Sequence, residues 1–206
     1  ADATEHWRRN KGRCNGSMYW QLNDCWGVCS WSSIDYYGNY KALQYGARHF
    51  NAPVSVSIEN TEEYIKLFVL NDLKEKQDVT VTYDIFDFVS GTKQSDKKDV
   101  SIDAVKNELV FELDVKSLAK AYDLKRTGVA VKLFKNGELL QQKTVLFDKE
   151  KKLDLPKAKL KTRIEIKEDR LEITVKSDAY ARLVKLESAD SVLPFSDNFF
   201  DIFSFY

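Results

Sequence analysis

The chain has 206 residues, of which 43% are hydrophobic, and its 32 basic residues balance 32 acidic residues to a net charge of +0. A neutral balance offers no electrostatic attraction to nucleic acid or to an anionic membrane, so neither is expected as a partner. No apolar run approaches the roughly 20 residues needed to span a bilayer. The length is sufficient for one large core or two small ones.

The chemically distinctive side chains gather in the first quarter of the chain. Residues 16–35 contain three of the four tryptophans, and no Trp, Cys or His follows residue 55. Cys14, Cys25 and Cys29 are odd in number and lack the second ligand pair of a zinc site. We therefore expect packed, reduced thiols, no metal site and no cofactor.

The first 52 residues predict one α/β unit. Residues 2–10 have a helical composition, and Lys11-Gly12 then supplies the C-terminal signal of a cationic residue followed by glycine. Residues 16–22 mix small, aromatic and apolar side chains, as expected of a strand buried on both faces. A polar loop follows, and residues 39–50 place apolar side chains at helical spacing before Pro53. Because such a strand needs parallel neighbours on both sides, the unit is not expected to be stable alone.

From Val54 the apolar period changes from about 3.6 to 2, which indicates strands. Residues 79–85 alternate strictly, and the change of parity at Phe86 predicts a β-bulge. Asn136-Gly137 predicts a type I′ hairpin turn, whereas the charged run at residues 97–99 is interpreted as a solvated turn. Short strands without helices between them predict an antiparallel β-sandwich of immunoglobulin-like type.

The charged residues 149–159, with Pro156, are interpreted as a domain boundary. Further alternating strands follow, but about 50 residues are few for an independent domain. We expect three regions, namely residues 1–52, a sandwich at 53–156 and a partial second sandwich at 157–206. Because the chain opens without Met or a signal peptide, we also expect it to be part of a longer polypeptide.

Flat rings beside amide and carboxylate groups suit a sugar, whose C–H faces pack on indole while its hydroxyls need planar hydrogen-bonding partners. The residues that combine these features, at the C-terminal end of the predicted strand and just beyond it, are Trp20, Asn23, Asp24 and Trp26. They are the candidate substrate-binding residues. The alternative is that the aromatic residues of this stretch form core, and we favour core for Tyr19, Trp31 and Tyr36.

Several blocks of the sequence resemble one family in order and spacing. These blocks are Gly16-Ser-Met-Tyr-Trp-Gln-Leu-Asn-Asp-Cys-Trp26, Ser30-Trp-Ser-Ser-Ile-Asp-Tyr-Tyr-Gly38, Lys41-Ala-Leu43, Phe50-Asn-Ala-Pro-Val54 and the closing Phe195-Ser-Asp-Asn-Phe-Phe-Asp201. They resemble the β-mannosidases of glycoside hydrolase family 2. The likeness is dense over residues 5–55 and persists beyond them as domain order.

The resemblance implies a mainly β chain that begins with the last β/α unit of a (β/α)8 TIM barrel. It further implies a retaining exo-glycosidase that releases terminal β-D-mannosyl residues from an oligosaccharide or glycan, using two glutamates. Both glutamates are expected upstream of Ala1, so this chain is predicted to carry no catalytic residue and to be inactive alone. Trp20 matches the position that floors the pocket. The family's compartments are periplasmic, secreted or lysosomal.

A second hypothesis is a non-catalytic carbohydrate-binding or interaction module built on the sandwich. An exposed row of aromatic side chains on one sheet face would favour it. A third, compatible with the first, is a structural cap that stabilises the barrel.

Overall fold

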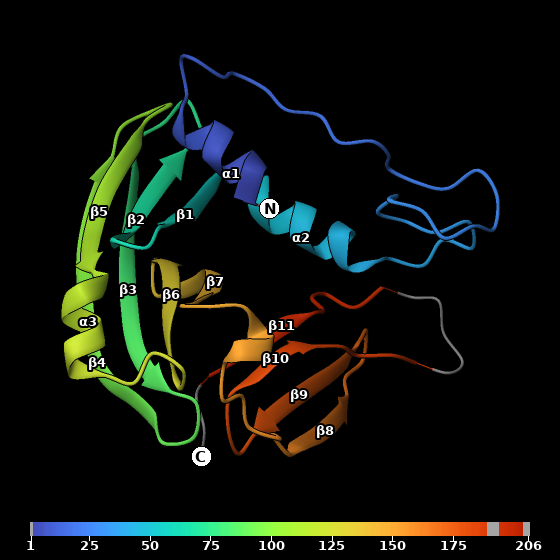
Figure 1. Cartoon of the computed structure of the whole chain (residues 1–206). Helices are drawn as coiled ribbons and strands as arrows, with labels where there is room; N and C mark the ends of the chain where they lie inside the picture. The colour runs from blue at the N-terminus through green and yellow to red at the C-terminus, as the bar shows by residue number, and fades with distance from the viewer. Residues whose placement is uncertain (1, 189–193, 204–206) are drawn as a thin grey trace.

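The computed structural model describes residues 2–188 and 194–203, and Figure 1 shows that antiparallel sheets are the main regular structure among them. Two sheets face each other in a seven-stranded immunoglobulin-like sandwich. One sheet has the order β1-β2-β5, with β1 Val54–Asn60, β2 Tyr64–Asn71 and β5 Asn107–Asp114. The other has the order β4-β3-β6-β7, with β4 Gly91–Ile102, β3 Gln77–Asp87, β6 Thr127–Lys135 and β7 Glu138–Leu146.

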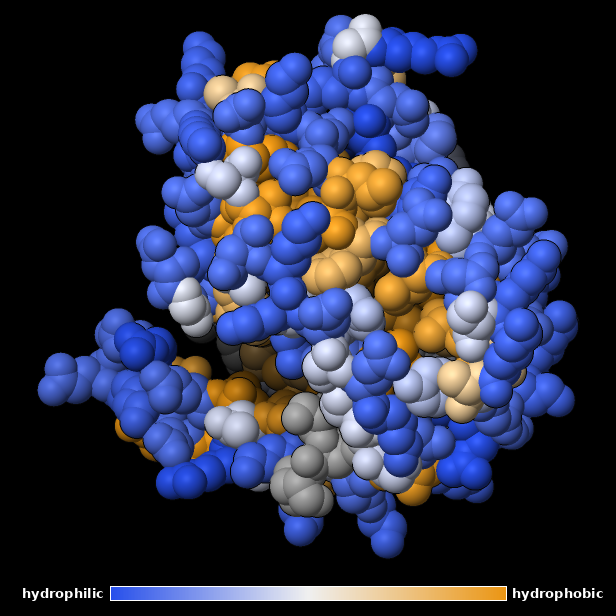
Figure 2. Space-filling model, turned by 90° about the vertical axis from the view of Figure 1, so that its left-hand side faces the viewer, coloured by the Kyte–Doolittle hydropathy of each residue, from blue (hydrophilic) through white to orange (hydrophobic). Residues whose placement is uncertain are grey.

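The first core lies between these two sheets and follows the period-two pattern of the sequence. Val56 and Leu67 from one sheet, and Val81 and Val131 from the other, have no solvent exposure. Burying each such side chain contributes about 1.5–3 kcal/mol relative to leaving it in water. Figure 2, viewed from the side of β5 and α3, shows apolar surface gathered in the middle of this face within a hydrophilic rim.

Two local predictions for the sandwich are confirmed. The register of β3 against β4 shifts between Ile85 and Phe86, where the sequence changes parity. Asn136 and Gly137 both have positive φ, 52° and 80°, as a type I′ turn between β6 and β7 requires. The short helix α3, Val115–Ala121, begins where the Ser117 amide donates to the Asp114 side chain at 2.7 Å.

The interpretation of residues 97–99 as a turn is wrong, because they lie in the middle of the twelve-residue strand β4. This strand is at the edge of its sheet, and only Val100 and Ile102 are buried. Polar side chains therefore occupy both faces of most of the strand, which removes the alternation. Lysines on an edge strand also discourage pairing with another chain.

A second, smaller set of strands follows a single-turn helix η1, Glu150–Lys152. It contains the hairpin β8 Leu160–Ile166 and β9 Leu171–Ser177, and the pair β10 Ala181–Val184 and β11 Phe200–Ile202. A second core joins these strands to the first sandwich, and its buried members are Phe86, Phe88, Ala130, Leu153, Tyr180 and Phe203. The rings of Phe88 and Tyr180 stack with centroids 5.1 Å apart.

Two helices precede the sandwich, α1 Asp2–Arg9 and α2 Ala42–Phe50, and Figure 1 shows α1 beside β1. The contact between α1 and the sandwich is largely polar. Arg9 donates to the Ser57 hydroxyl at 2.6 Å, and the Asn107 side chain donates to the Arg8 carbonyl at 2.8 Å. Lys143 on β7 pairs with the buried Glu5 carboxylate.

The strand predicted for residues 16–22 is not present, which corrects the expected α/β unit in this chain. A strand with two apolar faces needs hydrogen-bonding neighbours on both sides. Within the described residues, the bridges near this segment are confined to Asn23 with Ile34 and Ile34 with Tyr40. Residues 16–22 consequently run as extended, irregular chain from α1 into the loop (Figure 1).

Candidate functional site

The candidate site is the aromatic segment, residues 16–41, which connects α1 to α2 and projects away from the sandwich (Figure 1). Backbone hydrogen bonds fold it back on itself. The Ile34 amide donates to the Leu22 carbonyl at 2.8 Å, and the Asp24 amide donates to the Ile34 carbonyl at 3.1 Å. The Lys41 amide then donates to the Ser33 carbonyl at 2.9 Å, which brings the start of α2 against the returning arm.

The centre of the aromatic segment is polar. The Lys41 ammonium donates to Oδ2 of Asp24 at 2.9 Å and to the Ser32 hydroxyl at 2.7 Å. The Ser30 hydroxyl donates to the other carboxylate oxygen of Asp24. Hydrogen bonds from Ser30 and Lys41 hold the pKa of Asp24 below its usual value, although desolvation opposes them. Asp24 is therefore an ionised carboxylate that is 5% exposed and bound on both oxygens.

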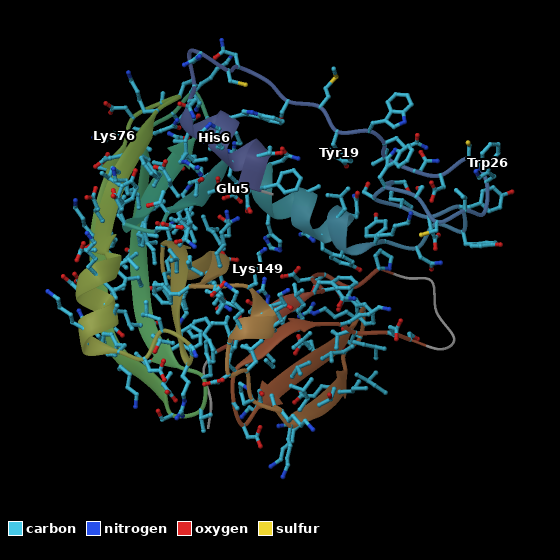
Figure 3. The ribbon with its side chains drawn as sticks, viewed as in Figure 1. Glu5, His6, Tyr19, Trp26, Lys76 and Lys149 are labelled. Atoms are coloured by element: carbon cyan, nitrogen blue, oxygen red, sulfur yellow. The ribbon has the colours of Figure 1, made fainter. Side chains whose placement is uncertain are left out.

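The aromatic side chains of the segment lie on its outside. Trp20 is 76% exposed, and Trp26 and Trp31 are each 68% exposed. Figure 3 shows Trp26 at the far end of the segment, with Tyr19 nearer the helices. This arrangement of polar groups inside and rings outside is the reverse of a hydrophobic core. Large exposed apolar groups gathered in one place mark a binding surface.

The four predicted site residues lie close together in the chain but differ in exposure. Trp20, Asn23 and Trp26 are exposed, whereas Asp24 is buried among its hydrogen-bonding partners. The Gln21 side chain donates to the Asn23 carbonyl at 2.7 Å and so supports the backbone there. The peptide bond between Trp20 and Gln21 is cis. Two indole rings and one amide thus face solvent around one buried carboxylate, and the binding role of the four residues stays a prediction.

Two expectations for this segment are wrong for the chain as it stands. Tyr19, Trp31 and Tyr36, which the sequence assigns to a core, are all exposed, since no further strand within the described residues covers them. The cysteines are free, as expected, but Cys25 and Cys29 are exposed rather than packed. Both corrections have the same cause, which is the missing strand pairing of residues 16–22.

A turn beyond the loop is organised by Asp35. Its carboxylate accepts hydrogen bonds from the amides of Tyr37 and Asn39, at 2.9 and 2.8 Å, and from the Asn39 side chain at 2.8 Å. Desolvation raises the pKa of Asp35, but the bonds from Asn39 and Tyr37 outweigh it and the pKa is lowered. Asp35 therefore anchors the loop.

Sequence reasoning missed Lys41, together with Ser30 and Ser32. Nothing in the local sequence pattern around Lys41 indicates that its side chain reaches Asp24. The sequence signal that could have pointed to Lys41 and the serines is the local composition. Ser30, Ser32 and Ser33 flank Trp31, and Lys41 is a lone lysine near the start of the predicted helix.

Two hollows lie next to the helices. A groove of about 1240 Å³ runs between α1, α2, β7 and β10, and Trp7, His49, Gln142 and Arg182 are among its lining residues. A smaller one of about 400 Å³ is bordered by Tyr19, Tyr45, Arg48 and Phe195.

Among residues 2–188 and 194–203, no group of His, Cys, Asp or Glu is arranged to hold a metal ion. No helix in those same ranges is long and apolar enough to span a bilayer.

Comparison with protein families identifies two domains in the chain. Residues 63–152 match the family described as Mannosidase Ig/CBM-like domain, and residues 155–204 match an Ig-fold domain of mannosidases. The first match covers most of the seven-stranded sandwich, and the second covers the strands β8 to β11.

Curated relatives agree with these family matches. A β-mannosidase of Bos taurus is 50% identical over 58 residues, which are 25% of this chain and 7% of the bovine protein. β-Mannosidase A of Aspergillus terreus is 40% identical over 91 residues, which are 43% of this chain and 9% of the fungal protein. The matched parts are thus a small share of the relatives' own length.

Solved structures extend the likeness to nearly the whole chain. A β-D-mannosidase of Dictyoglomus thermophilum has a TM-score of 0.82 and 31% identity, covering 97% of this chain and 24% of its own. An exo-chitosanase of Amycolatopsis orientalis has a TM-score of 0.70 at 16% identity, covering 97% of this chain and 28% of its own, which shows a shared fold. Together with the domain families and the curated relatives, this likeness shows that the chain belongs to the β-mannosidases of glycoside hydrolase family 2 and corresponds to their C-terminal part.

Proposed function

We propose that the chain forms one wall of the sugar pocket of a retaining exo-glycosidase that hydrolyses terminal β-D-mannosyl residues. The observation that carries this proposal is the outward presentation of Trp20 and Trp26, with the exposed Asn23 between them, on a loop that has its own polar centre. The two sandwiches are accessory domains of the same enzyme. The names of the relatives support β-mannoside as the substrate class.

Each of the four site residues has a role that follows from its chemistry. The indole of Trp20 presents a flat apolar face to the C–H groups of the reacting sugar, and Trp26 extends that surface. The Asn23 amide offers both a donor and an acceptor to sugar hydroxyls. Asp24 fixes the loop that carries these three residues, because Ser30 and Lys41 donate hydrogen bonds to its carboxylate.

Residues 1–52 are proposed to be the end of a (β/α)8 barrel, with α1, an eighth strand at residues 16–22 and α2. Neighbouring barrel strands from upstream would supply the hydrogen-bonding partners that residues 16–22 lack here. Residues 53–156 and 157–206 are proposed to be the two following domains. The acid/base and nucleophile glutamates of a retaining enzyme lie about 5 Å apart, and both are proposed to lie upstream of Ala1. The chain alone is accordingly proposed to be inactive.

The alternative, a carbohydrate-binding module built on a sheet face, receives less support. Such a face would carry a row of exposed aromatic rings. The exposed large apolar side chains on the described strands are all aliphatic, and Leu109, Leu139 and Leu160 are examples. Tyr83, Phe86 and Phe88 are buried.

The test is Trp20→Ala in the whole native polypeptide that contains this chain, assayed with an aryl β-D-mannopyranoside. We expect kcat/KM to fall by about 30-fold or more, since loss of a central aromatic contact costs roughly 2 kcal/mol. Trp7→Ala is the matched control, because Trp7 is a half-exposed tryptophan on α1 outside the aromatic segment. Unchanged kinetics for Trp20→Ala would contradict the proposal.

A further inference from the structure

Lys41 is the last residue of the aromatic segment, and its side chain lies in the polar centre of that segment. It directly precedes α2, and its ammonium reaches into the loop to contact three of its residues. It donates to Asp24 at 2.9 Å, to the Ser32 hydroxyl at 2.7 Å and to the Ser30 carbonyl at 3.4 Å. The Lys41 side chain is 29% exposed and its Asp24 partner 2%, so this ion pair is largely removed from water.

These contacts hold together both arms of the loop that carries Trp26. Asp24 lies on the outgoing arm, Ser30 and Ser32 lie on the returning arm, and Trp26 lies in the arc between them. The Ser30 hydroxyl closes the arc a second time by donating to Asp24. The backbone amide of Ser32 in turn donates to the Ser30 hydroxyl at 3.0 Å. One ammonium and one carboxylate thus determine the course of the arc.

The same centre reaches back to Trp20 through the backbone. Ser33, next to Ser32, donates its amide to the carbonyls of Gln21 and Leu22 at 3.2 and 3.1 Å, and its hydroxyl donates to Leu22 at 2.8 Å. Trp20 is the residue before Gln21. A displacement of the returning arm therefore moves the backbone on which Trp20 stands.

An unpaired charge on Asp24 would destabilise this polar centre. Removal of the Lys41 ammonium leaves a buried, ionised Asp24 without its cation, and a buried charge that loses its partner is strongly destabilising. The loop has few apolar contacts of its own to resist rearrangement, because its rings are exposed. The polar centre, rather than a core, determines where the rings stand.

We propose that Lys41 is a positioning residue of the sugar pocket, which holds Trp26 and Trp20 in place through Asp24, Ser30 and Ser32 without contacting the sugar itself. This inference rests on the proposed function, because it assumes that these two rings bind the sugar. It assigns to Asp24 a supporting role shared with Lys41.

The experiment compares Lys41→Met, Lys41→Arg and Asp24→Asn/Lys41→Met in the whole native polypeptide, measuring kcat and KM with an aryl β-D-mannopyranoside. Misplacement of binding groups by about 1 Å can cost roughly 100-fold in rate, so we expect kcat/KM of Lys41→Met to fall between 10- and 100-fold, mainly through KM. Lys41→Arg retains the charge and should recover most of this loss. The double variant removes the orphaned carboxylate and should be no worse than Lys41→Met.

A spectroscopic readout separates positioning from general stability. Three of the four tryptophans of this chain lie in the aromatic segment, so quenching of their fluorescence by iodide, measured at a dilution where light scattering shows a monomer, reports on their placement. Lys41→Met should change the quenching, whereas the control Lys152→Met should not. Lys152 pairs with Asp148 at 3.1 Å on the surface of the sandwich region, far along the chain from the aromatic segment.

The outcomes distinguish this inference from the proposed function. If Trp20→Ala loses activity while Lys41→Met keeps normal kinetics and quenching, the positioning role is overturned. If Trp20→Ala is fully active, the proposed function fails, and changed quenching in Lys41→Met then supports only the effect on the loop. If Lys41→Met does not fold, Lys41→Arg decides, because normal KM with the charge retained supports the inference and a KM raised at least tenfold opposes it.

Discussion

At the scale of single residues, Gly128 shows how closely the second core is packed. A Cβ added to this β6 residue would lie 2.7 and 2.9 Å from ring atoms of Phe86 and 3.3 Å from the Val145 carbonyl. Phe86 is fully buried, with its ring 5.2 Å from Tyr180 and 5.3 Å from Phe203 between centroids. The ring therefore has little room to retreat, and only glycine allows it to lie against β6.

Gly128→Ala is accordingly expected to lower the free energy of unfolding by about 1–3 kcal/mol, the usual cost of overpacking a core. Urea unfolding followed by circular dichroism measures it. Gly46→Ala is the matched control of opposite sign, because Gly46 lies inside α2 and its nearest neighbour to an added Cβ is Phe50 at 3.9 Å. That control should be neutral or stabilising by up to about 1 kcal/mol. A neutral Gly128→Ala would contradict the packing argument.

At the scale of elements, α1 is attached to the sandwich by charge as well as by shape. The Lys143 ammonium on β7 donates to the Val56 carbonyl at 2.6 Å and to the Glu5 carboxylate of α1. Both side chains of the pair are largely buried, with 17% and 8% exposure. The pair thus joins three elements, α1, β1 and β7, at one point.

Lys143→Met should lower the free energy of unfolding by about 3 kcal/mol or more, because it leaves Glu5 buried without its cation. The double variant Glu5→Gln/Lys143→Met should be more stable than Lys143→Met, since it removes the orphaned charge. Lys66→Met serves as the control, because Lys66 meets the half-exposed Glu112 at 3.4 Å and such surface pairs contribute at most about 1 kcal/mol. Equal effects of Lys143→Met and Lys66→Met in thermal unfolding would refute this account.

The elements that sequence predicted are those whose signals are local. The alternation in residues 79–85 and the Asn136-Gly137 turn act over a few residues, and β3 and the β6–β7 hairpin formed as expected. β4 escaped prediction because its hydrogen-bonding partner β3, rather than its own pattern, makes it a strand. The prediction for residues 16–22 is wrong for the opposite reason, since their apolar pattern requires neighbouring strands that the described part of the chain does not supply.

The residues of the candidate site also differ in whether a local sequence signal reveals them. Trp20 and Trp26 are candidates from the sequence alone, because aromatic rings beside amides are visible in the composition, whereas the exposed Trp31 is wrongly assigned to a core. Lys41 cannot be recognised in this way, because its role depends on a fold that brings its side chain to Asp24, 17 positions earlier in the chain. The division of the chain at residues 52 and 156 stays a prediction.

At the scale of the whole molecule, two apolar surfaces besides the one seen in Figure 2 lack a cover within the described residues. One is the aromatic segment, and the other is a face of the β8–β9 hairpin, where Ile164 is 61% and Ile166 83% exposed. Ile164 pairs with Ile173 and Ile166 with Leu171 across the hairpin, so one face collects these side chains. Surfaces of this kind promote association between copies of a chain.

The isolated chain is therefore expected to dimerise or aggregate through residues 1–52. Light scattering over a range of concentrations measures this. Trp20→Gln, Trp26→Gln and Trp31→Gln combined should shift the population toward monomer, whereas Ile164→Thr/Ile166→Thr tests the hairpin face as a comparison. A monomeric unmodified chain at high concentration would count against the expectation, and an effect of the isoleucine pair alone would move the contact to the hairpin.

The shared second core sets a limit on how this chain can be recombined. Phe86, Phe88 and Ala130 belong to the first sandwich, Leu153 to the connection, and Tyr180 and Phe203 to the smaller strand set. The Tyr180 amide also donates to the Phe88 carbonyl at 2.7 Å. A chimera joined near residue 155 would leave buried rings of both parents facing foreign or open surface. In protein engineering, the unit that can be transplanted is thus the pair of sandwiches together, with residues 54–203 exchanged as one piece.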